Sequence, residues 1–89
     1  MALKSIKIQR RRLADEVYDQ LLESITIGDI GPDDRLVQER LAAELDISRT
    51  PVREALLRLE QEGVLVTANR GGFKLHRMSE PEVRQLYQA

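Results

Sequence analysis

Three segments of this chain carry apolar residues at steps of three and four, and each is followed by a residue that ends helices. The stripes predict amphipathic helices over about residues 11–27, 37–45 and 49–62, the first ended by Gly28 and the third by Gly63. The second helix is so short that it needs packing against its neighbours to be stable. For the third helix, Ser48 is a good N-cap and Pro51 fits the first turn. Its apolar stripe consists of Val52, Ala55, Leu56 and Leu59.

Beyond Gly63 the pattern changes from helical to extended. Residues 64–67 predict a strand, residues 68–72 a turn, and residues 73–77 the returning strand of a hairpin, while residues 35–36 favour a very short strand. The expected fold is therefore mainly α with a small β-hairpin, in the order of three helices followed by a two-stranded wing.

Length and composition exclude several classes of protein. A chain of 89 residues allows one domain, and with only 3% aromatic residues its core must come from Leu, Ile, Val and Ala. Without cysteine it has neither disulfides nor a thiolate zinc site. It also lacks the apolar run needed to cross a membrane and the apolar core of a secretory signal, so we expect a cytoplasmic protein.

Charge is segregated along the chain, although the net charge is only −1. Residues 1–14 hold five bases and no acid, residues 15–34 hold seven acids and no base, and residues 47–77 hold six bases against three acids. A polyanion would experience the two basic blocks locally. If a polyanion binds, we expect the acidic face of the first helix to point away from it. The alternative is that these charges only solvate surface faces.

The second helix, a short break and the third helix suggest a helix-turn-helix, in which the N-terminal residues of the second helix of the unit enter the major groove. Arg49 and Arg53 lie four residues apart and off the apolar stripe, and arginine binds guanine with two donors. Ser48 and Thr50 can contact phosphate or a base. Two arginines at this spacing are a weak signal alone, because a solvated face explains such a pair more often than not.

The hairpin strengthens this interpretation. Arg70, Gly71 and Gly72 form its predicted tip, where glycine permits positive φ and close approach of the backbone to a neighbour. A loop that presents arginine and bare backbone N–H groups suits the minor groove or phosphate. A glycine-rich turn with an incidental arginine is the alternative.

Residues 41–56, which include the stretch Ser-Arg-Thr-Pro-Val-Arg-Glu-Ala-Leu at 48–56, resemble the DNA-binding domain of GntR-family bacterial transcription regulators. The resemblance extends over about residues 10–77. It implies a winged helix-turn-helix with a recognition helix at about 49–62 and a wing at about 64–77. The DNA contacts that it implies are Ser48, Arg49, Thr50, Arg53, Arg70 and Gly71.

Two positions depart from the family pattern. Asp46 stands where many members have glycine, and we expect the turn to survive because aspartate tolerates left-handed backbone. Glu39 stands where some members have a DNA-contacting arginine, so we expect no contact there. Arg40, next to it, is a doubtful substitute.

We therefore divide the chain into three segments. They are a basic arm at 1–10, the winged-helix domain at 11–77, and a linker with the start of another helix at 78–89. The last begins with a capping-box pattern at 79–82, and we expect the natural protein to continue beyond it. It resembles the start of the all-helical effector domain of the FadR-like branch. That resemblance implies a homodimer, controlled by a small-molecule effector, on double-stranded operator DNA that forms an inverted repeat. We assign no metal or cofactor to these 89 residues.

Enzymatic activity has no support, because His76 is the only histidine and no nucleophile or carboxylate is placed beside it by spacing. A winged helix that binds a protein instead of DNA remains the alternative. Such a module would expose apolar anchors on its third helix, where this chain has Arg49, Thr50 and Arg53 and only Leu57 as an apolar candidate.

Overall fold

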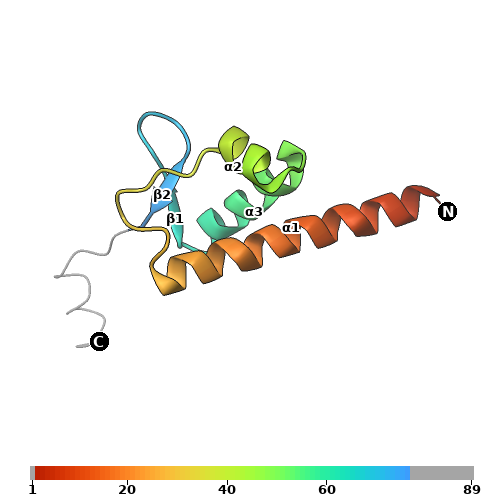
Figure 1. Cartoon of the computed structure of the whole chain (residues 1–89), viewed down its shortest axis with the longest axis horizontal. Helices are drawn as coiled ribbons and strands as arrows, with labels where there is room; N and C mark the ends of the chain where they lie inside the picture. The colour runs from red at the N-terminus through yellow and green to blue at the C-terminus, as the bar shows by residue number, and fades with distance from the viewer. Residues whose placement is uncertain (1, 77–89) are drawn as a thin grey trace.

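The computed structural model describes residues 2–76, with side chains from residue 12 onwards. Helices α1 (Ala2–Ile27), α2 (Gln38–Leu45) and α3 (Arg49–Gln61) precede a hairpin of strands β1 (Leu65–Thr67) and β2 (Phe73–Leu75). Figure 1 shows α2 and α3 on one side of the long helix α1, with the hairpin at their end. The predicted fold class is confirmed. The helix expected from residue 79 lies outside the described residues.

Helix α1 begins at Ala2, nine residues before its predicted start. The predicted basic arm at 1–10 is therefore part of a helix from Ala2 onwards. Residues 2–10 contain no glycine or proline and consist mostly of good helix formers, so the helix propagates through them. The start of the helix was predicted too late because the prediction relied on the apolar stripe, which begins only at Leu13.

The core lies between the three helices and the base of the hairpin. Helix α3 is its centre: Val52, Leu56 and Leu59 are 0% exposed, so the predicted stripe is confirmed. Val17 and Leu21 of α1 cover this stripe from one side. The buried apolar residues are Val17, Leu21, Leu36, Ala42, Val52, Ala55, Leu56, Leu59 and Leu65.

Helices α2 and α3 end in the same way, although one uses aspartate and the other glycine. Asp46 adopts left-handed backbone (φ 56°, ψ 47°), and the N–H groups of Asp46 and Ile47 donate to the carbonyls of Ala43 and Ala42. At the end of α3, Gly63 (φ 84°) and Val64 donate in the same pattern. The expectation that Asp46 preserves the turn is confirmed.

The hairpin is antiparallel and pairs Leu65 with Leu75 and Thr67 with Phe73. The very short strand expected at residues 35–36 is present as a single bridge between Leu36 and Phe73. Their N–H groups donate to each other's carbonyls at 2.7 and 2.8 Å. This bridge attaches the segment before α2 to the hairpin and places the hairpin beside the helix-turn-helix.

Candidate nucleic-acid interface

The start of α3 exposes four of the six predicted site residues. Pro51 and Val52 are buried, whereas Ser48, Arg49, Thr50 and Arg53 are exposed. Because Val52 is anchored in the core, the arginines on either side of it project outwards. The structure therefore brings these four residues together on one surface.

Ser48 occupies the N-cap position of α3 with extended backbone (φ −70°, ψ 166°), as predicted. Its side chain, however, makes no capping hydrogen bond. The predicted N-cap position is confirmed, and the hydroxyl does not cap the helix. That hydroxyl is exposed beside Arg49 and Thr50.

Arg58, one of the six bases counted at 47–77, belongs to a different surface. Its guanidinium lies 3.9 Å from the centre of the Tyr18 ring and forms ion pairs with Asp15 (3.4 Å) and Glu62 (3.6 Å). Tyr18 donates a hydrogen bond to the Glu62 carboxylate. This hydrogen bond is the main cause that raises the pKa of Tyr18, and the partial removal of the phenol from water is the second cause. Arg58 thus connects α3 to α1, and its charge is already balanced by carboxylates.

The wing tip exposes the other two predicted site residues, Arg70 and Gly71. The turn is closed by Ala68, whose N–H donates to the Gly72 carbonyl and whose carbonyl accepts from Gly71. Gly71 has φ 93°, and a Cβ atom there would meet no heavy atom within 4 Å. Glycine is therefore required at this position for backbone conformation alone.

Gly72 is required for a second reason. Its φ is 75°, and a Cβ atom at this position would lie 2.6 Å from the Leu36 carbonyl oxygen and 3.3 Å from Cγ of Arg35. The expected close approach of the wing backbone to a neighbour is confirmed, and the neighbour is the segment that leads into α2.

Arg35 is the basic residue at this surface that the sequence analysis missed. It is exposed, and its Nη1 donates to the Arg70 carbonyl oxygen at 3.3 Å. Since the contact joins residues 35 positions apart, no periodicity or local motif reveals it. The only available signal was the adjacent glycine pair in the wing, which indicates a close backbone neighbour without identifying it.

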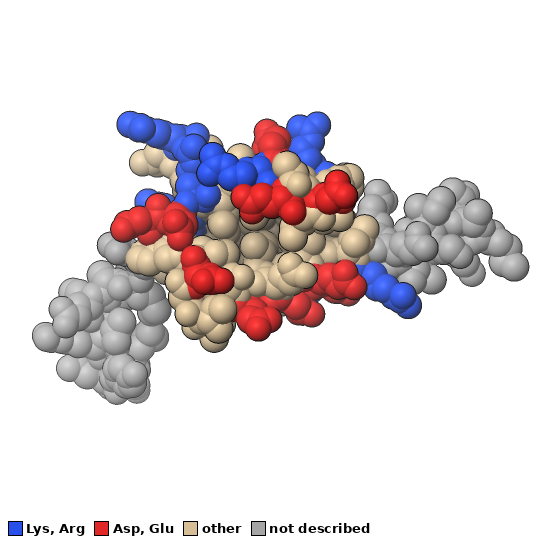
Figure 2. All heavy atoms as spheres, viewed as in Figure 1, with Lys and Arg blue, Asp and Glu red and all other residues tan. Residues whose placement is uncertain are grey.

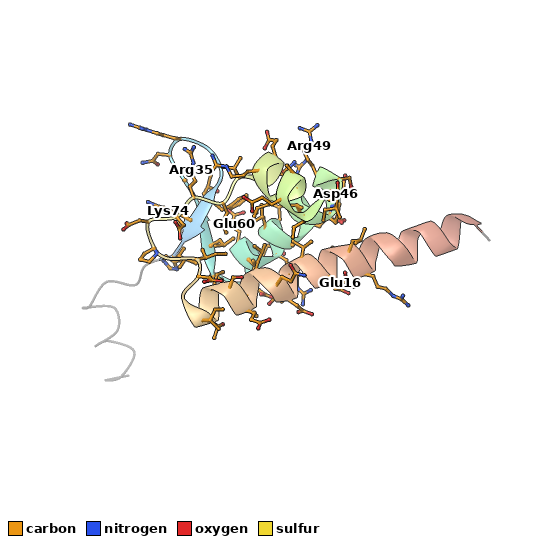
Figure 3. All side chains as sticks on the ribbon, viewed as in Figure 1. Glu16, Arg35, Asp46, Arg49, Glu60 and Lys74 are labelled. Carbon is orange, nitrogen blue, oxygen red and sulfur yellow. The ribbon has the colours of Figure 1, made fainter. Side chains whose placement is uncertain are left out.

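Basic side chains are concentrated on one edge of the domain. Figure 3 places Arg49 and Arg35 on the side away from α1, with Glu16 on α1 itself. In Figure 2 most blue side chains lie along the edge formed by the wing and the helix-turn-helix, with red side chains among them, while the α1 edge is mostly red. Glu39 and Arg40, the two residues considered at the start of α2, are both exposed.

His76 is exposed, and its Nδ1 donates to the Gly63 carbonyl at 3.2 Å, at the base of the wing. Within residues 12–76, no three His, Asp or Glu side chains gather in a way that would hold a metal ion. No helix of the described part is long and apolar enough to cross a membrane.

Three helices, a helix-turn-helix whose second helix exposes its N-terminal arginines, and a two-stranded wing define a winged helix-turn-helix domain. A sequence profile described as "Bacterial regulatory proteins, gntR family" matches residues 13–75. The chain therefore belongs to the GntR family of bacterial regulatory proteins.

Individual relatives agree with this assignment. The chain is 39% identical over 82 residues to the HTH-type transcriptional regulator McbR of Escherichia coli, covering 90% of this chain and 35% of that protein. It is 33% identical over 72 residues to YdhC of Bacillus subtilis, an uncharacterized HTH-type transcriptional regulator, covering 81% of this chain and 32% of YdhC. The chain thus spans about a third of the length of these curated relatives.

Solved structures show the same fold. The structure of E. coli McbR/YncC matches with a TM-score of 0.73 and 33% identity, covering 85% of this chain and 36% of that one. YtrA from Sulfolobus acidocaldarius, a GntR-family transcription factor, matches with a TM-score of 0.64 and 25% identity, covering 84% and 69%. The domain is accordingly the DNA-binding domain of a GntR-family transcription regulator, and its relatives are regulators and not enzymes.

Proposed function

We propose that this domain binds double-stranded operator DNA with the N-terminal end of α3 in the major groove. Ser48, Arg49, Thr50 and Arg53 would contact bases and phosphates there, while Arg70 and Gly71 would contact the adjacent minor groove or its phosphates. The observation that carries the proposal is the contrast within α3. Among residues 12–76, no carboxylate pairs with Arg49 or Arg53, whereas Arg58 is paired twice.

The spacing of the two arginines suits base recognition. Arg49 and Arg53 are four residues apart, about 6 Å along the helix axis. Arg49 precedes and Arg53 follows the buried residues Pro51 and Val52, which limit the backbone motion of both arginines. Each guanidinium offers paired donors for O6 and N7 of guanine. The N-terminal end of α3 adds a partial positive charge directed at phosphate.

We extend the proposal to the whole protein. A homodimer would place two recognition helices on the half-sites of an inverted repeat, because a two-fold symmetric protein matches a two-fold symmetric operator. The remainder of the protein would bind a small-molecule effector that controls this contact. The protein would act in the cytoplasm, where bacterial DNA lies, and the described residues would need no cofactor for it.

Protein binding is the weaker alternative. The exposed large apolar side chains of the described part are Ile27 and Leu57, at 67% and 37% exposure, and only Leu57 lies on α3. A single half-exposed leucine is a poor anchor for a protein interface, which depends on clustered apolar or aromatic anchors.

The test compares Arg49→Ala and Arg53→Ala with Arg58→Ala as a matched control on the same helix. Bound duplexes are first selected from a random pool at low salt, and affinities for the enriched and a scrambled duplex are then measured by fluorescence anisotropy. We expect each of the first two variants to lose about 1–3 kcal/mol on the enriched duplex and much of its sequence preference. Arg58→Ala should bind like the unaltered domain. Equal loss in all three variants, or no retention of any duplex, would contradict the proposal.

A further inference from the structure

We propose that Arg35 is a third DNA-binding element of the domain, which positions the wing tip through its backbone and contacts a DNA phosphate through its remaining donors. This inference rests on the proposed function, and it adds a residue from outside both the recognition helix and the wing. It follows from three independent features of the region where the segment before α2 meets the wing.

The first feature is the firm attachment of the Arg35 backbone to the wing. The next residue, Leu36, is 6% exposed and exchanges two hydrogen bonds with Phe73 at the start of β2. Because Leu36 is both buried and paired, the Cα atom of Arg35 has a defined position relative to the wing. Its side chain is on the exposed side of this attachment.

The second feature is the contact with the wing tip. Nη1 of Arg35 donates to the carbonyl oxygen of Arg70 at 3.3 Å. This approach depends on Gly72, at which a Cβ atom would lie 3.3 Å from Cγ of Arg35. A guanidinium has five N–H donors, and this hydrogen bond uses only one of them. Arg35 can therefore hold the Arg70 backbone and bind an anion at the same time.

The third feature is the charge around the junction. Arg35, Arg70 and Lys74 line one small hollow of about 210 Å³ between the segment and the wing. Two aspartates also line it, but Asp34 turns a carboxylate oxygen to the Gly31 N–H of its own turn, at 2.7 Å. No carboxylate among residues 12–76 forms an ion pair with Arg35. Three cations with unused donors fit a phosphate oxygen better than a neutral base edge.

Arg35 also lies on the correct side of the molecule. Figure 3 shows it beside the wing loop and, like Arg49, on the side away from α1. A duplex that meets Arg49 at α3 and Arg70 at the wing tip would pass the segment between them, where Arg35 projects. The expected partner of Arg35 is therefore the sugar-phosphate backbone between the major-groove contact and the wing contact.

The test measures binding of the selected duplex across a salt series for Arg35→Gln, Arg35→Lys, Arg70→Ala and the double variant Arg35→Gln/Arg70→Ala. Arg58→Gln is the matched control, because it removes an arginine from the opposite side of α3. Circular dichroism establishes that each variant is folded. Amide NMR spectra of the free domain report whether the wing tip has moved.

We expect Arg35→Gln to weaken binding to every duplex and to reduce the salt slope by about 0.9, the value for one lost phosphate contact. Arg35→Lys should keep most of the slope. In the free domain, Arg35→Gln should shift the amide signals of Gly71 and Gly72, and the double variant should lose less affinity than the two single losses combined.

Two results would overturn the role of Arg35 and leave the proposed function of the domain unaffected. One is wild-type affinity and slope in Arg35→Gln, and the other is weakened binding at an unchanged salt slope, which would reduce Arg35 to a structural residue. Failure of the unaltered domain to bind any duplex would overturn the proposed function together with this inference.

Discussion

Replacement of Gly72 by alanine tests whether the wing is held against the segment before α2 by close backbone packing. A Cβ atom at Gly72 would lie 2.6 Å from the Leu36 carbonyl oxygen, so one of the two backbones must move. Movement breaks the paired hydrogen bonds between Leu36 and Phe73, at 2.7 and 2.8 Å. Gly71→Ala is the matched control, because Gly71 also has positive φ but has open space around the position of a Cβ atom.

The difference between the two variants isolates the packing contribution. Positive φ costs a non-glycine residue about 1–2 kcal/mol, and this cost applies to both variants. The smaller freedom of alanine in the unfolded chain also applies to both and cancels. Loss of two backbone hydrogen bonds adds about 1–3 kcal/mol to the cost of Gly72→Ala alone. We therefore expect Gly72→Ala to be the more destabilising variant by about 1–3 kcal/mol.

Urea unfolding followed by circular dichroism measures the global free energy of unfolding, and amide hydrogen exchange measures local opening of the wing. Exchange at the Leu36 and Phe73 amides should accelerate in Gly72→Ala and stay near wild type in Gly71→Ala. If the wing opens only locally, Gly72→Ala should accelerate exchange at these two amides while the urea midpoint changes little. Equal destabilisation and equal exchange in both variants would refute the packing argument and leave only the φ requirement.

Three further predictions concern the helix contacts. Arg58→Ala should lower the free energy of unfolding by about 0.5–1 kcal/mol through its partly exposed ion pairs, and by less in high salt; a salt-independent loss would indicate lost packing instead. The raised pKa of Tyr18 means that the folded protein retains this proton above pH 10, where the unfolded chain releases it, so unfolding should become easier as the pH rises from 10 through the folded-state pKa. Tyr18→Phe should remove that part of the pH dependence, and the difference between the absorbance titrations at 295 nm of the unaltered domain and of Tyr18→Phe, which keeps Tyr87, measures the pKa of Tyr18. Asp46→Gly should stabilise the domain by about 0.5–1 kcal/mol and Asp46→Ala should destabilise it, since Asp46 has left-handed backbone; urea midpoints in the opposite order would contradict the helix-end geometry.

The helical part of the fold could be predicted because its information is local. Val52, Ala55, Leu56 and Leu59 are spaced for one helix face, and all four are buried. Asp46 and Gly63 could be assigned as helix ends because few residue types accept left-handed backbone. The start of α1 was missed because its first nine residues are helical without continuing the apolar stripe.

The predicted site residues could be located for a similar reason. A buried stripe on α3 leaves Arg49, Thr50 and Arg53 on the other side, and a glycine-rich hairpin tip leaves Arg70 exposed. Helical spacing places Arg58 on the other side of α3 from Arg49, but the sequence could not show what Arg58 contacts there, because that depends on where α1 lies. Asp15 and Tyr18 are 43 and 40 positions away in the chain and contact Arg58 only after α1 has packed against α3.

The sequence by itself determined which segments are helices, which faces are apolar and which residues begin the recognition helix, since each depends on neighbours a few positions apart. Only the tertiary structure decided which charges remain available to an external anion. Packing of α1 on α3 pairs Arg58 with Asp15 and places it over the Tyr18 ring, in addition to its local i,i+4 pair with Glu62. Pairing of Leu36 with Phe73 brings Arg35 to the carbonyl of Arg70 at the wing tip. Electrostatic interactions decay with distance in space and not along the chain, so the binding surface exists only once the helices and the wing have assembled.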